Sequence, residues 1–501
     1  METQSKLGVG GKISYGLGAV GKDMVYMLSA SYVLYYFQDI LGVSAAAMGV
    51  ILLVARIFDA FNDPIMGVVV AKTKTRWGKF RPWLLIGTLT NAVFLYLMFA
   101  APPSLDGAGL VAYAAVTYIM WGVTYTMMDI PYWSMIPAFT NGGKERENLT
   151  TLARSCAGVG SAIISILTMV VVPFLGKKFG GVVPEALVSR YPGQQWIEFN
   201  GFRIFTLIVA ILFIVFTILT CIGVKEKSNV DMKTASIGDM FKALVQNDQA
   251  MTVVVTIVVI NVALYITSNL MIYFVKYDLG GLNWNGDYAL FNTVGGGTQI
   301  LAMMLLYPLL RNLCKLNNIK IFYVSVWMSI IGYIGILVMS MAGINNIVPF
   351  LIPGVLVMAS AGMNNVIITV FLANTVDYGE LKNNRRDESV IFSMQTFVVK
   401  LASGISAFIA SLALQFLNLK NVAEEADEAG SAVSEAIDFS LGVSAGSKMG
   451  LRMVMTLIPI AGLIFALLWF KKRYILTDQK VEEIAQEVKA RKSSSEAPSE
   501  N

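Results

Sequence analysis

The chain has no histidine among its 501 residues and only three cysteines. The lack of histidine excludes a histidine proton relay and histidine metal ligands, so proton or ion chemistry must rest on the acidic residues. Cys156, Cys221 and Cys314 lie in or beside apolar segments, without the spacing of a disulfide framework or a metal site. We therefore expect the cysteines to fill small spaces in the core.

Charged residues are also scarce. Only 14% of the residues are charged, 56% are hydrophobic, and the mean hydropathy is +0.64. A soluble protein carries far more charge on its surface, so this composition predicts a membrane protein.

The formal net charge of +5 comes from loops and tail and does not indicate nucleic-acid binding. The short polar N-terminus, Met1 to Lys12, leads into a full-length apolar segment, which is not the pattern of a cleaved signal peptide.

Long apolar segments fill most of the chain and predict an all-α polytopic membrane protein. The segments lie near 13–38, 43–71, 82–101, 109–139, 149–175, 202–223, 248–276, 286–310, 320–342, 347–375, 389–418 and 446–470. A polar stretch at 225–247 divides these twelve segments six and six. The division predicts the major facilitator fold, with six-helix bundles at 1–224 and 248–473, a central cytoplasmic loop between them, and a tail at 474–501.

Lysine and arginine are distributed unevenly between the two sets of connecting loops. One set is rich in them: Lys72, Lys74, Arg76, Lys79, Arg81, Lys144, Arg146, Lys225, Lys227, Lys233, Arg311, Lys315, Lys320, Lys382, Arg385, Arg386 and Lys471 to Arg473. The other set has few basic residues and an acidic run at 424–438. The positive-inside rule therefore predicts that both termini are cytoplasmic. The tail from Thr477 onward predicts a surface helix followed by a disordered end.

Asp59 and Asp63 lie four residues apart in the middle of an apolar segment. Placing an ionised carboxylate near the bilayer centre costs roughly 2.5–3.5 kcal/mol, so two on one segment indicate a function. The spacing puts both on one helix face, with Asn62 beside them. Side-chain oxygens gathered at one depth are what a small hard cation needs in place of its water shell. The segment therefore predicts a cation site.

Further charges interrupt other apolar segments, and we expect them to meet across a central cavity. The acids expected there are Asp23, Asp59, Asp63 and Asp129, and the bases are Arg154 and Lys400. Lys22 and Arg56 are expected nearer the helix ends or in separate pairs. The excess of acids would be reduced by a bound cation or by protonation of one acid, and both mechanisms remain open.

Each of these charges also has a structural alternative. Arg56 and Lys400 can hold Asp59 and Asp63 as a buried pair without any bound ion. Arg154 and Lys400 can serve only to balance charge.

Tyr125 and Trp133 flank Asp129 at steps of four residues, on similar helix faces. Proteins bind sugars with an aromatic ring beside charged groups. The apolar ring covers the C–H face of the sugar while the charged groups form hydrogen bonds with its hydroxyls. The pattern favours a neutral polyhydroxylated substrate. Alternatively, the two aromatic residues are ordinary core packing, and Asp129 satisfies backbone groups freed at Pro131.

Three motifs resemble the glycoside–pentoside–hexuronide:cation symporters. They are Arg56-Ile-Phe-Asp-Ala-Phe-Asn-Asp-Pro-Ile-Met-Gly67, Thr75-Arg-Trp-Gly-Lys-Phe-Arg-Pro-Trp83 and Tyr125-Thr-Met-Met-Asp-Ile-Pro-Tyr-Trp133. The similarity extends to Gly21-Lys-Asp23, Val376-Asp-Tyr-Gly-Glu380 and Gln395-Thr-Phe-Val-Val-Lys400, and so covers most of the chain. Within the family, the chain is most similar to the sodium/melibiose branch.

This resemblance implies a role for each candidate residue. The implied cation-binding residues are Asp59, Asn62, Asp63 and Thr126, with Asp59 and Asp63 as the Na+ ligands. The implied substrate-binding residues are Asp23, Asp129, Arg154 and Trp133, with Lys22 and Tyr125 at the edge of the sugar site. Lys400 would couple the two sites, and Arg76, Lys79 and Arg81 would belong to a cytoplasmic gating loop.

The chain also departs from the family pattern. Asn364-Asn365 stand where the sodium/melibiose branch has an aromatic residue, and the outer loops near 176–201 and 419–446 are longer. The departures leave the exact glycoside open, whereas the intact cation set favours Na+ or Li+ over H+.

We therefore expect a secondary active transporter of a bacterial cell membrane, acting as a monomer with no catalytic residues, no cofactor besides the coupling ion and no nucleic-acid partner. It would couple Na+ to uptake of melibiose or another galactoside by alternating access, with Li+ or H+ as alternative coupling ions. The alternatives are a proton-coupled symporter of a different glycoside or pentoside, a lipid-type solute carrier and a sugar sensor. An enzyme is disfavoured, since the chain lacks histidine, a catalytic cysteine pair and a phosphate loop.

Overall fold

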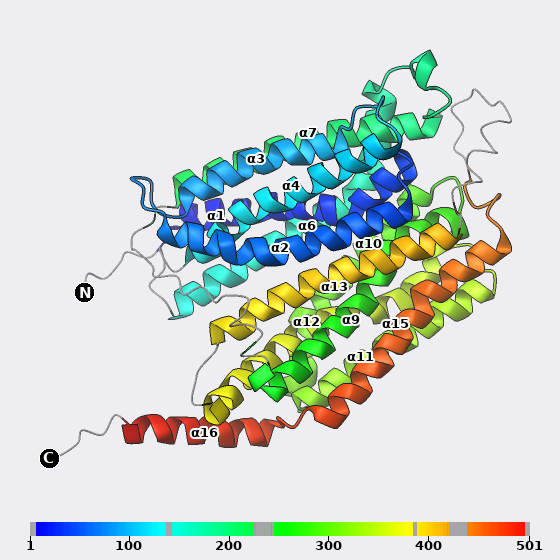
Figure 1. The fold of residues 1–501 in the computed structure, drawn as a ribbon. Coiled ribbons are helices and arrows are strands. Elements are labelled where there is room, and N and C mark those ends of the chain that lie inside the picture. The colour runs from blue at the N-terminus through cyan, green and yellow to red at the C-terminus, as the bar shows by residue number, and fades with distance from the viewer. Residues whose placement is uncertain are drawn as a thin grey trace. The chain divides into compact units, whose positions relative to one another are not determined.

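The computed structural model describes residues 7–136, 143–191, 193–224, 226, 242, 245–383, 388–417, 419 and 438–495. These residues are almost entirely helical (Figure 1). The chain divides into two compact units, each described here by itself. The first unit comprises 1–234, 275–293 and 407–447, and the second comprises 235–274, 294–406 and 448–501. The acidic outer run and most of the central loop lie outside the described residues.

The first unit is built mainly from six long helices. They are α1 (Val9–Tyr35), α2 (Ala45–Lys72), α3 (Arg81–Phe99), α4 (Gly107–Ser134), α6 (Gly143–Phe179) and α7 (Gly193–Gly223). A π-helical turn, η1 (Tyr36–Ile40), extends α1, and a short 3-10 turn, η2 (Glu185–Leu187), precedes α7. Helix α1 packs against α6 and α7, α3 packs against α4 and α7, and α2 packs against α4.

The second unit contains the remaining long helices. They are α9 (Asp248–Tyr273), α10 (Trp284–Leu301), α11 (Asn318–Met341), α12 (Ile347–Asn383), α13 (Glu388–Leu417) and α15 (Ala445–Arg473). The π-helical turns are η3 (Phe274–Leu279), η4 (Ala302–Leu306) and η5 (Leu309–Leu313). Parts of these elements cluster with the first unit instead, namely η3 from Val275 onward, the start of α10 up to Thr293 and the end of α13 from Ala407. The tail helix α16 (Asp478–Ser495) packs on α12.

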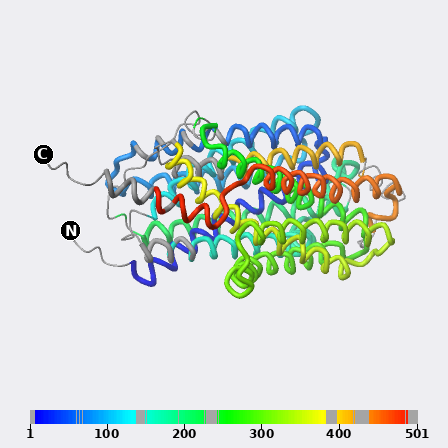
Figure 2. The backbone as a smooth tube through the Cα atoms, turned by 90° about the horizontal axis from the view of Figure 1, so that it is seen from below, coloured from blue at the N-terminus to red at the C-terminus, as the bar shows by residue number. Residues whose placement is uncertain are grey.

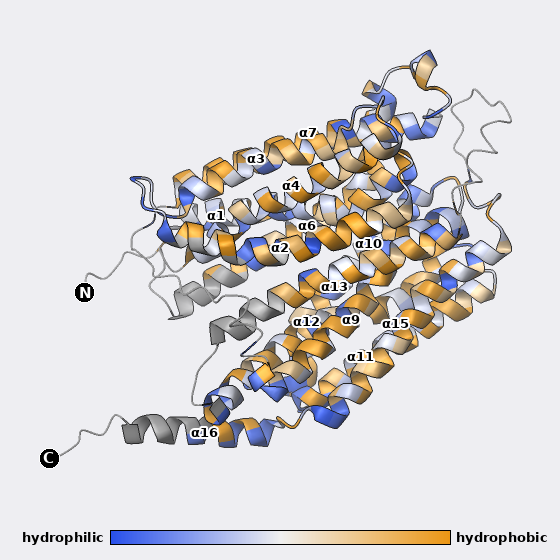
Figure 3. Ribbon diagram, viewed as in Figure 1, coloured by the Kyte–Doolittle hydropathy of each residue, from blue (hydrophilic) through white to orange (hydrophobic). Residues whose placement is uncertain are grey.

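Eleven helices of the described chain are long and apolar enough to cross a membrane. Helix α1 is not among them, although it has 27 residues, because its charged and glycine-rich stretch lowers its mean hydropathy. Together these twelve helices coincide with the twelve predicted apolar segments. Apolar residues run along the helices, whereas hydrophilic residues gather at helix ends and in the connections (Figure 3).

Small residues let the helices of the first unit approach closely. A Cβ added at Gly160 of α6 would collide with the backbone carbonyl of Val20 in α1, and one at Gly201 of α7 would collide with that of Val172 in α6. Contacts of this kind replace the hydrophobic driving force that is missing inside a bilayer. The helices of each unit therefore run side by side along much of their length (Figure 2).

Candidate functional site

The predicted substrate residues gather around Lys22 on α1. The Lys22 ammonium lies 2.9 Å from Asp23 Oδ2 and 2.9 Å from Asp129 Oδ1, and it donates to the Tyr125 hydroxyl at 3.3 Å. The Lys22 side chain is only 5% exposed. Lys22 therefore lies between the two acids, more centrally than the edge position that the resemblance implied. A buried lysine with two carboxylate partners keeps its charge without access to bulk water.

Trp133 closes one side of this cluster. Its indole Nε1 donates to Asp129 Oδ1 at 3.1 Å, which fixes the ring relative to the carboxylate four residues earlier. The Arg154 guanidinium lies 4.3 Å from the ring centroid, and Lys22 Nζ lies 5.1 Å from it. Cations over an indole face are attracted by its quadrupole. The structure thus brings Arg154 and Trp133 together as the sequence predicts, with the guanidinium over the ring.

The predicted cation residues form a second cluster between α2 and α4. Thr126 Oγ1 donates to Asp63 Oδ1 at 2.9 Å, and Arg56 lies 3.2 Å from Asp59 Oδ2. Asp59 packs against Gly122, where an added Cβ would lie 2.6 Å from Asp59 Oδ1. Position 122 therefore has to be glycine for the carboxylate to remain where it is.

Asn62 lies beside these carboxylates with an unsatisfied amide. Its buried Nδ2 atom has no hydrogen-bond partner among the described residues. A half-turn of the amide would present its oxygen instead, and amide oxygens are ligands for hard cations. The donor set of two carboxylates, one hydroxyl and one amide thus fits a small monovalent cation. In the part of the chain that the structure describes, no three His, Cys, Asp or Glu side chains gather as a metal cluster.

Helix α4 belongs to both clusters. Thr126 contacts the acid pair on α2, whereas its neighbour Tyr125 and the following Asp129 contact Lys22 on α1. Helix α4 is therefore the structural element that the two clusters have in common.

Within the first unit, the candidate residues carry four acids and three bases. The acids are Asp23, Asp59, Asp63 and Asp129, and the bases are Lys22, Arg56 and Arg154. The sequence predicts Lys22 and Arg56 nearer the helix ends or in separate pairs. Arg56 does form a pair with Asp59, whereas Lys22 bridges Asp23 and Asp129 within the candidate site. The sum is one negative charge, which one monovalent cation would neutralise.

Lys400 belongs to the second unit, on α13. Its backbone carbonyl accepts a hydrogen bond from Ser403 Oγ at 2.9 Å. Its predicted coupling role stays a prediction. Asn364, the predicted departure on α12, is buried and joined to Ser325 and Ser360 through 3.0 and 3.3 Å hydrogen bonds.

The predicted gating loop is held by a residue that the sequence analysis missed. The carboxylate of Glu226 accepts hydrogen bonds from the backbone N–H groups of Lys79, Phe80 and Arg81 at 2.6, 3.0 and 3.0 Å. Phe80 is the N-cap of α3 and Arg81 its first residue, and N–H groups at the start of a helix have no partner inside it. Arg76 in the same loop is exposed. No local signal in the sequence pairs Glu226 with a turn about 146 positions earlier.

The fold and the buried charged clusters together define a multi-pass helical membrane transporter of the major facilitator type. A solved bacterial homologue of the human lysosomal transporter Spinster, in an inward-facing and unoccupied conformation, shares this fold. Its TM-score is 0.64 at 12% identity, over 95% of this chain and 97% of that chain.

The family of MFS/sugar transport proteins matches residues 14–478, and the chain belongs to this family. The chain is 29% identical to the isoprimeverose transporter of Lactiplantibacillus pentosus, over 80% of this chain and 79% of that one. It is 26% identical to a Bacillus subtilis (strain 168) protein described as uncharacterized symporter YjmB, over 97% of both chains.

These findings confirm the predicted fold class and the assignment as a sugar transporter of the cell membrane rather than an enzyme. The similarity to the sodium/melibiose branch, the coupling ion and the roles of the site residues stay predictions.

Proposed function

We propose that the chain is a cation:glycoside symporter that couples Na+ to the uptake of melibiose or a related galactoside. The observation that carries the proposal is the sharing of α4 between the Asp63–Thr126 contact and the Asp129–Lys22 ion pair. Symport requires that the two ligands stabilise each other, and a helix that contributes to both sites is a direct route for such coupling.

In this proposal, the cation binds between Asp59 and Asp63, with Asn62 and Thr126 supplying neutral oxygens. Binding neutralises the single excess negative charge of the seven charged residues in the two clusters. The Arg56 guanidinium next to Asp59 stabilises the ionised carboxylate, which is the form that binds Na+. This observation favours Na+ or Li+ over H+.

The sugar binds around Lys22, between α1, α4 and α6. The described hydrogen bonds engage Oδ2 of Asp23 and Oδ1 of Asp129, so the second oxygen of each carboxylate faces no described donor. These two oxygens and the Tyr125 hydroxyl are suited to accept and donate bonds to sugar hydroxyls. The Trp133 indole, which both Arg154 and Lys22 approach, supplies aromatic surface beside the sugar ring.

The energetics of one cation per sugar suffice for accumulation. Moving one positive charge inward gains roughly 2.3 kcal/mol per 100 mV, which corresponds to about fifty-fold concentration of the sugar. A sodium gradient adds to this value. The loaded carrier then exposes its site to the other side by alternating access between its two six-helix halves.

The test is counterflow and uptake of radiolabelled melibiose, lactose, raffinose and isoprimeverose in proteoliposomes. The measurements use NaCl, LiCl or choline chloride at two pH values, with wild-type protein and Asp59→Cys. Uptake that requires Na+ or Li+ and is lost in Asp59→Cys supports the proposal. Uptake that follows the pH gradient and ignores Na+ contradicts it and favours proton coupling.

A protein that binds one of these sugars without any uptake or counterflow would be a sensor, which also contradicts the proposal. Thr117→Val is the matched control, since the Thr117 hydroxyl lies on the same α4 and donates only to backbone carbonyls of its own helix at 2.7 and 3.3 Å.

A further inference from the structure

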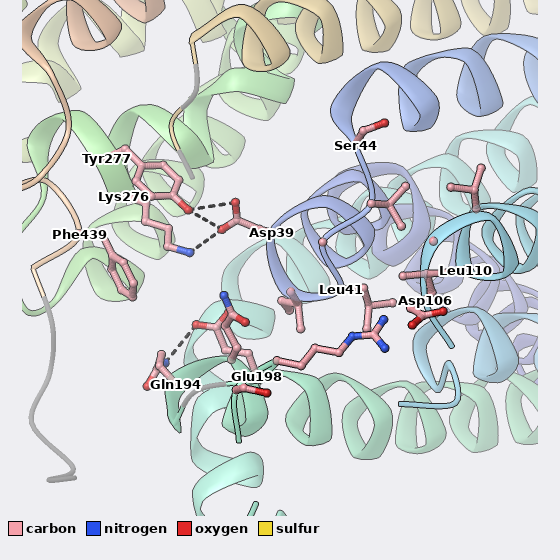
Figure 4. A pocket seen from close by; sticks show the side chains of 18 residues that line it. Asp39, Leu41, Ser44, Asp106, Leu110, Gln194, Glu198, Lys276, Tyr277 and Phe439 are labelled. Carbon is pink, nitrogen blue, oxygen red and sulfur yellow. Dashed lines mark hydrogen bonds and ion pairs between the residues drawn. The ribbon is translucent and has the colours of Figure 1, made fainter. Parts of the chain in front are cut away.

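The first unit contains a cavity of about 720 Å³ that is separate from the candidate site. It lies where η1 ends and where α2, α4 and α7 begin, and it is lined by parts of 39–44, 106–111 and 189–198 together with Lys276, Tyr277 and Phe439 (Figure 4). Its volume falls in the range of small-molecule sites, about 300–1,000 Å³. None of its lining residues belongs to the candidate site.

The cavity is also distant from that site along the helices. Ser44, which lines the cavity, precedes Asp59 by fifteen residues on α2. At 1.5 Å per residue, this places them roughly 20 Å apart. Asp39, another lining residue, follows Lys22 by seventeen residues along α1 and η1, so the cavity is roughly 25 Å from the Lys22 cluster as well and is a separate site. By the orientation that the lysine and arginine distribution predicts, this end of the unit faces outward.

One wall of the cavity is a fixed array of polar groups. Lys276 Nζ lies 2.5 Å from Asp39 Oδ2 and donates to the Tyr35 hydroxyl at 3.1 Å. The Tyr277 hydroxyl donates to the same carboxylate at 2.8 Å, and Tyr35 donates to Glu198 at 2.7 Å. Figure 4 shows Lys276 and Tyr277 reaching Asp39 from the opposite element. Mutually bonded side chains such as these hold their positions before a ligand arrives.

The other side of the cavity is fixed as well. Arg190 donates to the backbone carbonyls of Pro103, at 3.3 Å, and of Leu105. Gln194, which also lines the cavity, donates to Glu198 at 3.1 Å through its amide nitrogen. The half-buried Gln195 adds a second amide.

The composition of the lining indicates which ligand it fits. Its charges are Asp39, Asp106 and Glu198 against Arg190 and Lys276, so neither sign dominates. Amides and hydroxyls add donors and acceptors in comparable numbers. Such a mixture is unsuited to a strongly charged ligand, since part of the wall would always repel it. It matches a neutral molecule whose hydroxyls both donate and accept.

Apolar groups complete the lining. The Phe439 and Tyr277 rings stand at the end where Lys276 lies, with Nζ 4.5 and 5.0 Å from their centroids. Leu41 and Leu110 lie on the facing side (Figure 4). Sugar rings present C–H faces that pack on such surfaces while their hydroxyls bond to polar groups.

We infer that this cavity is a second sugar-binding site, distinct from the Lys22 cluster and reached from the outer side. It takes a neutral mono- or oligosaccharide. The inference rests on the proposed function in assuming that the substrate is a neutral sugar.

The test is protection of a single cysteine against a membrane-impermeant thiol reagent. Gln195→Cys is introduced into the full chain after Cys156, Cys221 and Cys314 have been replaced by serine. Alkylation is followed with melibiose, lactose or raffinose present, and with betaine at equal osmolarity as the control. The same measurements are repeated with Asp129→Ala, which disables the central site. The rate of alkylation can be measured without transport, so its result does not depend on the result of the uptake assay.

The expected result is alkylation slowed about tenfold at a sugar concentration near ten times the half-protecting value, in both backgrounds. Val182→Cys, at a position 93% exposed and outside the cavity lining, should show no protection. Ser189→Cys provides a second lining position if Gln195→Cys fails to fold.

Two outcomes would overturn the inference. Protection that disappears with Asp129→Ala would mean that the cavity only senses binding at the central site. An absence of protection by all three sugars would mean that the cavity holds no sugar, whatever the uptake assay shows.

Discussion

Asp39 and Lys276 form a buried ion pair although they are 237 positions apart in the chain. Their atoms Oδ2 and Nζ are 2.5 Å apart, and the side chains are 2% and 7% exposed. The pair fastens η1, which follows α1, to the turn η3, which follows α9, with Tyr277 as a second donor to the same carboxylate. A charge at such a site is tolerated because its partner is present.

Removing one charge of this pair should therefore destabilise the protein strongly. Asp39→Asn leaves the Lys276 ammonium buried without its counter-charge, and the expected loss is about 3–5 kcal/mol. Lys276→Met leaves the carboxylate and should have a comparable effect. The measurement is the unfolding midpoint of purified protein in detergent.

The double variant Asp39→Asn/Lys276→Met separates charge pairing from packing. It should recover most of the lost stability, because no unpaired charge remains. Strictly additive losses would instead show that the two side chains do not interact. Lys382→Ala is the matched control, since its ion pair with Asp248 is largely exposed and should contribute little.

The anchoring of the predicted gating loop by Glu226 gives the second prediction. Glu226→Ala removes the acceptor of three consecutive backbone donors at the start of α3. Because unsatisfied donors cost about 1–3 kcal/mol, we expect a lower unfolding midpoint together with slower sugar exchange. Glu226→Gln retains an oxygen acceptor and should lose less. Lys74→Ala, at an exposed position of the same loop, should change neither quantity appreciably.

Gly78 in this loop tests the same geometry by another route. Its φ is +104°, and an added Cβ would collide with the Glu226 carboxylate. Gly78→Ala should therefore reproduce the effect of Glu226→Ala, because it displaces the carboxylate as well as straining the backbone. A Gly78→Ala protein with unchanged stability and exchange would show that the loop is not held in this way.

The sequence predicted some parts of the fold and of the candidate site and not others, and the reason differs from residue to residue. Asp59 and Asp63 were found because they are close in sequence and exceptional in an apolar helix, and the twelve helices because hydropathy is a local property. Thr126 came only from a resemblance. Lys22 was placed incorrectly, since its partner Asp129 is on another helix.

The Asp39–Lys276 pair shows the limit more clearly. Both residues stand near helix ends, where charges are ordinary, and neither carries a signal of burial in its neighbourhood. Glu226 could not be paired from the sequence either. Its three partners are backbone N–H groups, which nearly every residue has, so no residue type marks them. Contacts of this kind depend on tertiary packing and follow from the fold, so hydropathy and spacing cannot reveal them.

The packing of Asp59 on Gly122 leads to the third prediction. In Gly122→Ala, the new Cβ would lie 2.6 Å from Asp59 Oδ1, so the carboxylate must shift away from α4. We expect about tenfold weaker Na+ dependence of sugar uptake, because a displaced ligand loses roughly 1.4 kcal/mol of binding free energy. Sugar affinity at saturating Na+ should change much less.

Gly109→Ala is the control for this substitution on the same helix, since the nearest atom to its added Cβ is 3.9 Å away. It should leave the Na+ dependence unchanged and favour the helix slightly. Equal effects of Gly122→Ala on Na+ and sugar would indicate general disruption of α4 and not displacement of one ligand.

The hydroxyl of Thr126 provides the most selective test of the cation site. Thr126→Val keeps the shape of the side chain but removes the hydroxyl that bonds Asp63 at 2.9 Å, whereas Thr126→Ser keeps the hydroxyl. If Thr126 supplies a neutral oxygen to the cation, the valine variant should require about ten times more Na+ for half-maximal sugar binding. The serine variant should remain close to wild type.

Because binding of the two ligands is linked, the valine variant should also lose the increase of sugar affinity that Na+ produces. Titrating sugar binding at several Na+ concentrations measures both quantities. A valine variant with wild-type Na+ dependence would remove Thr126 from the cation site and leave its contact with Asp63 as a structural hydrogen bond between α2 and α4.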